Sequence, residues 1–206
     1  MIMPPGISDP HGSAPDKSDT ALLIVDVIND LDFPEADQLA RFIPSMAEKL
    51  AKLKERAKNA KIPVIYVNDN FGRWRSDFRA LIKHCRNGRA ADLIDKLRPE
   101  HDDYFVLKPK HSGFFSSSLE TLLRYLGVNR LIITGIAGNF CVYFTANDAY
   151  MRDYKIVVPT DCVISNTKKE NAQALQSMKR YLKADIRPSS RLSLRKKRFS
   201  PNERFL

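Results

Sequence analysis

The chain has 206 residues and a formal net charge of +10, with 43% hydrophobic and 28% charged residues. This length fits one domain with a sizeable core, and the composition is that of a soluble globular protein. No apolar run approaches the roughly 18 residues of a membrane span. Because the first residues are polar and lack the apolar stretch of a signal peptide, we expect a cytoplasmic protein without a membrane partner. Residues 1–19 are expected to form a flexible arm.

The positive charge is concentrated near the C-terminus. Residues 187–206 contain seven Lys or Arg and one acid, a net charge of +6, which leaves +4 for the 186 residues before them. We therefore expect one domain over residues 20–187 and a basic tail over residues 188–206. Such a tail is more typical of a solvated chain end than of a phosphate-binding arm, so nucleic acid is not an expected partner. A scaffold protein that binds nucleic acid through this tail is the non-enzymatic alternative.

Short apolar runs alternate with helical patterns along the chain. Strands are predicted at residues 21–27, 63–67, 104–107, 130–134 and 155–158, and residues 184–186 are a candidate sixth strand. Apolar residues spaced three or four apart predict helices at residues 39–53, 117–126, 139–152 and 167–182, with a short helical pattern at 91–97. Ser117 and Thr167 each begin a capping-box pattern, with a glutamate three residues later. This alternation predicts an α/β fold of three layers, α/β/α, with a mostly parallel Rossmann-like sheet of five or six strands.

The cysteines are three in number, Cys85, Cys141 and Cys162, without a CxxC pair. An odd number at unrelated spacings argues against a disulfide framework or a zinc site, and favours thiols in a reducing compartment. The chain also has no GxGxxG motif and no P-loop, so dinucleotides and nucleoside triphosphates are not expected cofactors.

Cys141 is the first candidate for chemistry. An apolar, β-branched run ends at Thr134 and Gly135, and a turn of small residues leads to the cysteine at the start of a predicted helix. Backbone N–H groups are unpaired at a helix N-terminus and the local potential is positive there. We therefore expect the thiolate of Cys141 to be favoured over the thiol. Oxidation of such a thiolate, in a redox sensor, is one alternative to nucleophilic catalysis.

Asp26 and Lys108 follow the first and third predicted strands. Sites of parallel sheets form beyond the carboxyl ends of the strands, so both side chains are expected near Cys141. Asp26 could accept the thiol proton and return it to a leaving amine, while Lys108 holds the charged pair in place. The simpler alternatives are that Asp26 pairs with a basic group for structural reasons and that Lys108 lies on the surface.

Three segments in this order resemble the isochorismatase-like cysteine hydrolase superfamily. They are Asp26 after an apolar strand, residues 108–114 (KPKHSGF) and residues 134–142 (TGIAGNFCV), and the resemblance covers about residues 20–187. The superfamily includes nicotinamidases, N-carbamoyl amide hydrolases, ureidoacrylate-type amidohydrolases and isochorismatases. Its members form dimers and tetramers, so the resemblance implies a homo-oligomer.

The resemblance implies a triad of Asp26, Lys108 and Cys141. It also implies a cis peptide bond between Ile136 and Ala137, with the backbone N–H groups of Ala137 and Cys141 directed at an oxyanion. Attack by the thiol on a small amide, ureido or carbamoyl compound would then cleave its C–N bond through a thioester. The enzymatic alternative is hydrolysis of a vinyl ether, as in isochorismatases, with Asp26 as the acid and Cys141 dispensable.

Two positions depart from the family pattern. Residues 68–77, which follow the second strand, contain no histidine, whereas nicotinamidases bind a divalent metal through an Asp and histidines there. We therefore expect neither a metal, nor another cofactor, nor nicotinamidase activity. Gly138 stands where the family commonly has Thr or Ser, and we expect this change to matter little because backbone amides act on the substrate.

Four aromatic residues near these segments are candidates for the wall of a substrate pocket. They are Phe71, Trp74, Phe114 and Phe140. Core packing or contacts between subunits are the alternatives for these side chains. His111 and His84 lack neighbours at metal-ligand spacing, so we expect structural or exposed positions for them.

Overall fold

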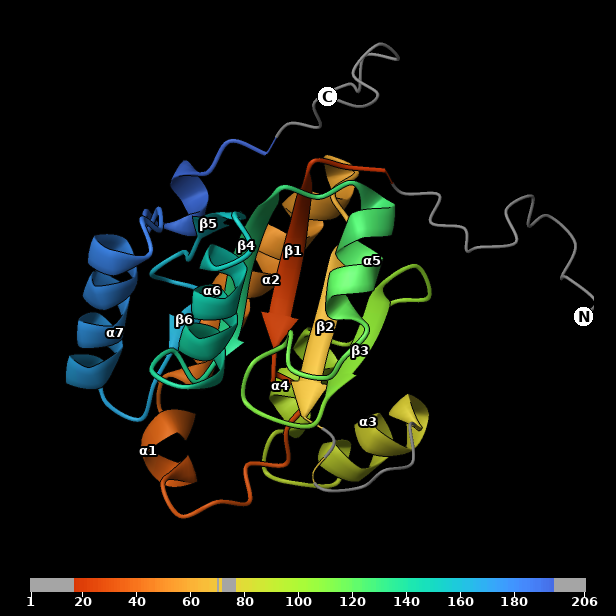
Figure 1. Ribbon diagram of the computed structural model, residues 1–206. Helices are drawn as coiled ribbons and strands as arrows, with labels where there is room; N and C mark the ends of the chain where they lie inside the picture. The colour runs from red at the N-terminus through yellow and green to blue at the C-terminus, as the bar shows by residue number, and fades with distance from the viewer. Residues whose placement is uncertain (1–16, 70, 72–76, 195–206) are drawn as a thin grey trace, which may run out of the picture.

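The computed structural model describes residues 17–69, 71 and 77–194 (Figure 1). Its sheet has the strand order β3-β2-β1-β4-β5, and β6 also pairs with β4. The strands are Thr20–Val25 (β1), Val64–Asp69 (β2), Tyr104–Lys108 (β3), Arg130–Ile136 (β4), Lys155–Val157 (β5) and Val163–Ile164 (β6). All pairings between these strands are parallel, so their carboxyl ends meet at one edge.

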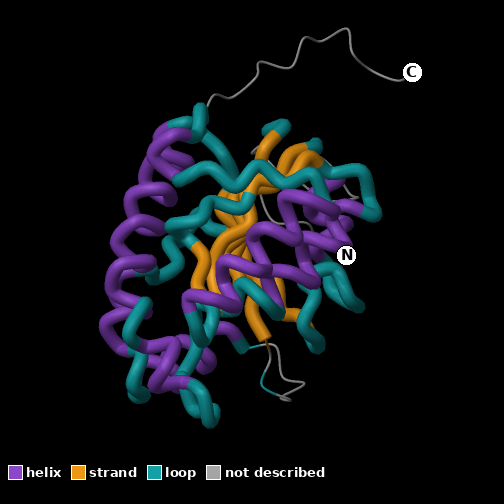
Figure 2. The backbone as a smooth tube through the Cα atoms, turned by 90° about the vertical axis from the view of Figure 1, so that its left-hand side faces the viewer, coloured by secondary structure: helices purple, strands orange, loops and turns teal. Residues whose placement is uncertain are grey.

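Helices cover both faces of the sheet, which confirms the predicted three-layer fold (Figure 2). They are Ala36–Ala40 (α1), Ile43–Asn59 (α2), Phe78–Arg86 (α3), Ala91–Lys96 (α4), Leu119–Leu126 (α5), Cys141–Tyr150 (α6) and Lys168–Tyr181 (α7), followed by a 3₁₀ turn at Ser189–Arg191 (η1). Within the described ranges, no helix is long and apolar enough to cross a bilayer.

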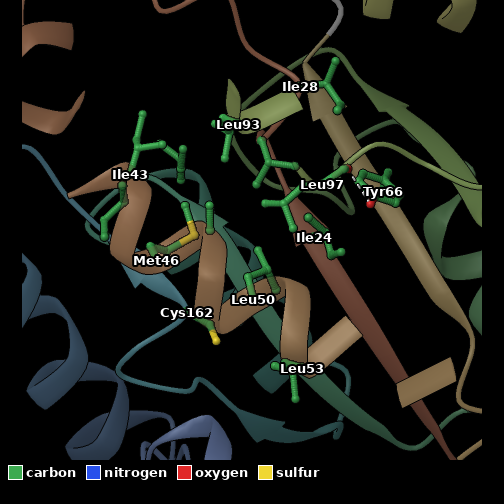
Figure 3. Packing of buried hydrophobic residues seen from close by; sticks show 14 of the residues in the cluster. Ile24, Ile28, Ile43, Met46, Leu50, Leu53, Tyr66, Leu93, Leu97 and Cys162 are labelled. Atoms are coloured by element: carbon green, nitrogen blue, oxygen red, sulfur yellow. Dashed lines mark hydrogen bonds between the residues drawn. The ribbon is translucent and has the colours of Figure 1, made fainter. Parts of the chain in front are cut away.

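The residues of β1 alternate between two apolar clusters because successive side chains of a strand point to opposite faces. Leu22 and Ile24 pack with α2 and α4 on one face, where Met46, Leu50 and Leu53 of α2 are buried (Figure 3). Ala21, Leu23 and Val25 pack with α5, α6 and α7 on the opposite face. Burial on both faces explains why β1 is apolar from residue 21 to residue 25.

The single helix predicted at residues 39–53 is divided into α1 and α2. Pro44 has no N–H to donate and cannot lie inside a continuous helix, but it fits the first turn of α2, where that donor would be unpaired. The structure also contains α3, which the apolar spacing did not predict. Its N-terminus is capped by Asp77, whose carboxylate accepts a hydrogen bond from the N–H of Ala80 at 3.0 Å.

The sixth strand is not at residues 184–186, where the sequence predicted it. Asp185 forms only an isolated bridge with Val157, and the sixth strand is the two-residue β6. The three cysteines, all of them within the described ranges, form no disulfide bonds, as expected.

The two ends of the described chain are held on the domain. Ser18, in the predicted N-terminal arm, is buried and donates its backbone N–H to Leu126. Residues 188–194, placed in the tail by the sequence, pack against α2. The guanidinium of Arg56 donates to the carbonyl oxygens of Ser189 (2.8 Å) and Leu192 (2.7 Å), and Leu192 is buried in the core. The rest of the predicted arm and tail lies outside the described residues.

Candidate active site

Asp26, Lys108 and Cys141 meet at the carboxyl edge of the sheet. Asp26 directly follows β1, Lys108 is the last residue of β3, and Cys141 is the first residue of α6. The Nζ atom of Lys108 lies 2.8 Å from Oδ2 of Asp26 and 3.6 Å from Sγ of Cys141. Lys108 is fully buried and Asp26 is 5% exposed. The expected convergence is therefore present, and Lys108 contacts both the carboxylate and the thiol.

Asp69 is a second acid at this site, which the sequence analysis did not single out. Its Oδ2 atom lies 3.7 Å from Nζ of Lys108, and its backbone N–H donates to Oδ1 of Asp26 at 2.7 Å. The available signal was its position as the last residue of β2, between the strands that end near Asp26 and at Lys108. Lys108 also donates to the carbonyl oxygen of Lys110 at 3.1 Å, so every donor direction of the ammonium faces a negative or polar group.

The loop after β1 is fixed by Asn68, which is fully buried. Its side chain accepts a hydrogen bond from the N–H of Ile28 at 3.2 Å and donates to the carbonyl of Ile28 at 2.7 Å. Asp26 itself has a φ of 49°, a left-handed conformation that Asp adopts more readily than most residues. Its own N–H remains bonded to the carbonyl of Val67 at 3.0 Å, so β2 holds the carboxylate at the sheet edge.

The thiolate expected at Cys141 is not favoured. Burial raises the pKa of the Cys141 thiol, and the negative charge of Asp26 raises it further, against the opposing effect of Lys108. The expectation took account of the helix N-terminus and of Lys108, but it left out burial, which has the largest effect on this pKa, and the negative charge of Asp26. Burial also raises the pKa of Asp26 against the attraction of Lys108. The pKa of Lys108 is raised, because its attraction to Asp26 and Cys141 outweighs the effect of burial.

The turn before Cys141 contains the cis peptide bond between Ile136 and Ala137, as the resemblance implied. Gly138 donates its N–H to the carbonyl of Ile164 at 2.7 Å, and Asn139 donates its N–H to Oγ of Ser165 at 3.1 Å. In contrast, the backbone N–H groups of Ala137 and Cys141 have no hydrogen-bond partner within the described part of the chain. These two donors are therefore available for a ligand oxygen.

Gly138 matters more than we expected from the sequence. A Cβ atom at this position would overlap the side chain of Asn171 and would lie 2.7 Å from Cγ1 of Val163 and 3.0 Å from Oγ of Ser165. The Ser165 hydroxyl donates to Oδ1 of Asn171 at 3.0 Å, and Nδ2 of Asn171 donates to the carbonyl of Val163 at 3.0 Å. A Thr or Ser side chain would fit here only if this hydrogen-bonded pair moved, because the pair occupies the space that the side chain would need.

The four aromatic pocket candidates have different positions. Phe71 is exposed, and its N–H donates to Oδ1 of Asp69 at 2.6 Å. Phe140 directly precedes α6, is 46% exposed and places its ring 4.1 Å from that of His111. Phe114, in contrast to our expectation, does not line an open pocket. It is 5% exposed and packs in the core. Trp74 lies outside the described residues.

No cluster of three or more His, Cys, Asp or Glu side chains suited to a metal ion occurs in the part of the chain that the structure describes. His84, one of the two histidines considered from the sequence, lies on the surface, with Nε2 3.1 Å from Oδ2 of Asp30. Asp69, the acid at the end of β2, is partly exposed and forms an ion pair with Lys108.

Comparison with known proteins places this architecture in a family. A family model described as the isochorismatase domain matches residues 20–186, which span the whole sheet. The chain belongs to the isochorismatase family. A family member from Bacillus subtilis (strain 168), the uncharacterized protein YaaI, is 47% identical over 170 residues, which cover 82% of this chain and 94% of YaaI. The protein is therefore an isochorismatase-family hydrolase.

Solved structures share the fold of this hydrolase. The nicotinamidase SaPncA from Staphylococcus aureus superposes with a TM-score of 0.64 at 25% identity, covering 82% of this chain and 98% of SaPncA. The N-carbamoylsarcosine amidase from Thermoplasma acidophilum gives a TM-score of 0.67 at 24% identity, covering 84% of this chain and 98% of the amidase.

A further relative was found by its sequence. The ureidoacrylate amidohydrolase RutB of Serratia proteamaculans is 43% identical over 70 residues, which are 34% of this chain and 28% of RutB.

Proposed function

We propose that this isochorismatase-family hydrolase cleaves the C–N bond of a small amide, ureido or carbamoyl compound through a thioester on Cys141. The observation that carries the proposal is the position of the Lys108 ammonium, 2.8 Å from the Asp26 carboxylate and 3.6 Å from the Cys141 sulfur in a buried site. Relatives whose names state amidase or amidohydrolase activity support the bond type.

The first step starts from a neutral thiol, because burial and Asp26 raise the pKa of Cys141. As Sγ attacks the carbonyl carbon, the thiol proton moves to the carboxylate of Asp26. The ammonium of Lys108 then faces the growing negative charge at sulfur and remains protonated, since its own pKa is raised. Asp26 is a stronger base than an exposed aspartate because burial raises its pKa.

The carbonyl oxygen becomes an oxyanion in this step. The unpaired N–H groups of Ala137 and Cys141 would donate to it, a stabilisation of about 3 kcal/mol for each donor at comparable sites. When the tetrahedral intermediate collapses, the C–N bond breaks and the proton on Asp26 passes to the leaving nitrogen. A water molecule then attacks the thioester while Asp26 accepts its proton, and the thiol of Cys141 is restored as the acid product leaves.

The proposal is tested with a panel of primary amides, N-carbamoyl amino acids and ureides, measured with and without a chelator. We expect turnover that the chelator does not change and that Cys141→Ala abolishes. Cys162→Ala is the matched control, because Cys162 is a buried thiol outside the Lys108 group. Electrospray mass spectrometry of the wild-type protein during turnover should detect an acyl adduct on Cys141. Full activity of Cys141→Ala, or hydrolysis of a vinyl ether by that variant, would overturn the thioester route.

A further inference from the structure

A cavity of about 340 Å³ lies between the first turns of α2 and the segment that leads from β6 into α7. Both lie at the end of the sheet to which the strand arrows point (Figure 1). None of Asp26, Lys108 and Cys141 is among the residues that line it. Its volume is in the range of pockets that hold small molecules. The cavity is therefore separate from the candidate active site but close to the turn that precedes Cys141.

The charges around this cavity favour an anion. Arg41, Lys49 and Lys168 line it, and within the described residues none of the three forms an ion pair. One acid, Asp161, is among the described lining residues. Its two carboxylate oxygens accept hydrogen bonds from the N–H (2.7 Å) and the hydroxyl (2.9 Å) of Ser189. The lining therefore carries a net charge of +2. A guanidinium such as that of Arg41 binds a carboxylate with two parallel hydrogen bonds.

The remaining wall has an apolar part, formed by four residues, and a polar part, formed by Ser45, Thr160, Ser165, Thr167 and Asn171. Met46, Val163 and Ile164 are buried and line the cavity, and the ring of Phe42 lies 5.9 Å from Nζ of Lys168. A ligand that matches both parts has one carboxylate and an apolar ring or chain. An inorganic anion would leave the apolar wall in contact with water, and a neutral apolar molecule would leave the cations without a partner.

The cavity also borders the turn that carries the unpaired amides. Ser165 and Asn171 line the cavity, and they are the residues that hold Gly138 and Asn139. A ligand that hydrogen-bonds to Ser165 or Asn171 therefore competes with, or reinforces, the bond from Asn139 N–H to Ser165 Oγ. We propose that this cavity is a binding site for a small organic carboxylate with an apolar body, and that its occupation acts on the turn between β4 and Cys141.

Benzoate is a suitable probe because it combines a carboxylate with a flat apolar ring. We expect titration of benzoate into the ¹⁵N-labelled full-length protein to shift the amide resonances of Gly138, Asn139 and Ser165, with a Kd below about 1 mM. Acetate lacks the apolar body and benzyl alcohol lacks the charge, so each should bind at least about tenfold more weakly.

Variants separate this site from the active site. Arg41→Gln and Lys168→Gln should each weaken benzoate binding by about threefold to tenfold, whereas Lys169→Gln, which changes an exposed neighbour outside the lining, should not. Cys141→Ala should bind benzoate like the wild type. Ser165→Ala should keep the binding but reduce the shift at Asn139, because the link to the turn is lost.

The proposal fails if benzoate does not bind, if benzyl alcohol binds equally well, or if Arg41→Gln and Lys168→Gln bind benzoate like the wild type. It also fails if Cys141→Ala abolishes binding, since benzoate would then occupy the active site. All these measurements are made without turnover, so their outcome is independent of whether the protein hydrolyses amides.

Discussion

The ammonium of Lys108 lies 2.8 Å from the carboxylate of Asp26, and neither side chain is appreciably exposed to solvent. A buried ion pair is costly to form but still more costly to break, since removing one partner leaves an uncompensated charge in the interior. A substitution that removes either side chain should therefore both disrupt the candidate active site and destabilise the folded protein.

Lys108→Met should lower the free energy of unfolding at neutral pH by about 3 kcal/mol or more. Without the ammonium, the pKa of Asp26 in the folded protein rises further above its unfolded value. At pH values between the pKa of Asp26 in the unfolded variant and its pKa in the folded variant, the folded state binds more protons than the unfolded state. The variant should therefore lose stability as the pH rises from about 4 to 7. Urea unfolding at several pH values measures this loss. Lys61→Met, which changes an exposed lysine, is the control and should leave the pH dependence as it is in the wild type.

Asp26→Asn should make Cys141 more reactive toward iodoacetamide, even though we expect the variant to be inactive as a hydrolase. The carboxylate of Asp26 raises the pKa of the thiol and Lys108 lowers it, so removal of the carboxylate increases the thiolate fraction at a given pH. In the wild type, labelling should be slow at neutral pH and accelerate as the pH rises. Peptide mapping gives the rate at each cysteine. An unchanged or slower rate at Cys141 in the variant would contradict the assigned effect of Asp26.

Asp69→Asn should lower turnover by about tenfold while leaving the fold intact, because Asp69 is partly exposed and contacts Lys108 at 3.7 Å. Its negative charge contributes to the raised pKa of Lys108. The alkaline limb of the pH–rate profile should therefore move to lower pH in the variant. Asp95→Asn, at a surface ion pair with Arg86, serves as the control. A parallel loss of turnover at every pH, without a shift of the alkaline limb, would show that Asp69 acts in another way.

Gly138→Ala should lower the free energy of unfolding by about 1–3 kcal/mol and reduce turnover, because the new Cβ meets Asn171, Val163 and Ser165. The double variant Gly138→Ala, Asn171→Ala makes room for the methyl group and should recover part of the loss in stability. Urea unfolding of the two single variants and the double variant gives the coupling energy. Additive losses would mean that Asn171 does not restrict this position.

Thr167→Ala should cost about 1 kcal/mol in the free energy of unfolding, because the Thr167 hydroxyl accepts the N–H of Glu170 at 3.1 Å and caps α7. Ser118→Ala is the matched comparison at the N-cap of α5, where the side chain makes no capping hydrogen bond. It should leave the stability nearly unchanged. Equal costs for the two substitutions would contradict this difference between the caps.

The two caps also show what the sequence could and could not predict. The pattern at Thr167 predicted the observed cap, whereas Ser117, which has the same spacing to an acid, lies one residue outside the cap of α5 and accepts from Leu119. Apolar runs predicted five strands because burial on both faces leaves a strong pattern. The two residues of β6 are too few for any pattern, and α3 has a short apolar stripe in a polar, basic segment.

The site was predictable to a similar degree. The topology rule for parallel sheets brought Asp26, Lys108 and Cys141 together before any distance was known. It did not supply the protonation state of the thiol, which depends on burial and on the distances to two opposite charges. Nor did it supply the close packing around Gly138, to which Asn171, a residue 33 positions further along the chain, contributes.

Arg56 and Leu192 give the C-terminal segment a role in folding. Leu192 belongs to the apolar cluster under α2, and its carbonyl accepts a hydrogen bond from the guanidinium of Arg56 in the last turn of that helix. During synthesis, the part of this cluster that Leu192 covers stays exposed until residue 192 has left the ribosome. Nascent chains that stop before Leu192 would expose that apolar surface, and are the forms in which chaperone binding and aggregation should concentrate.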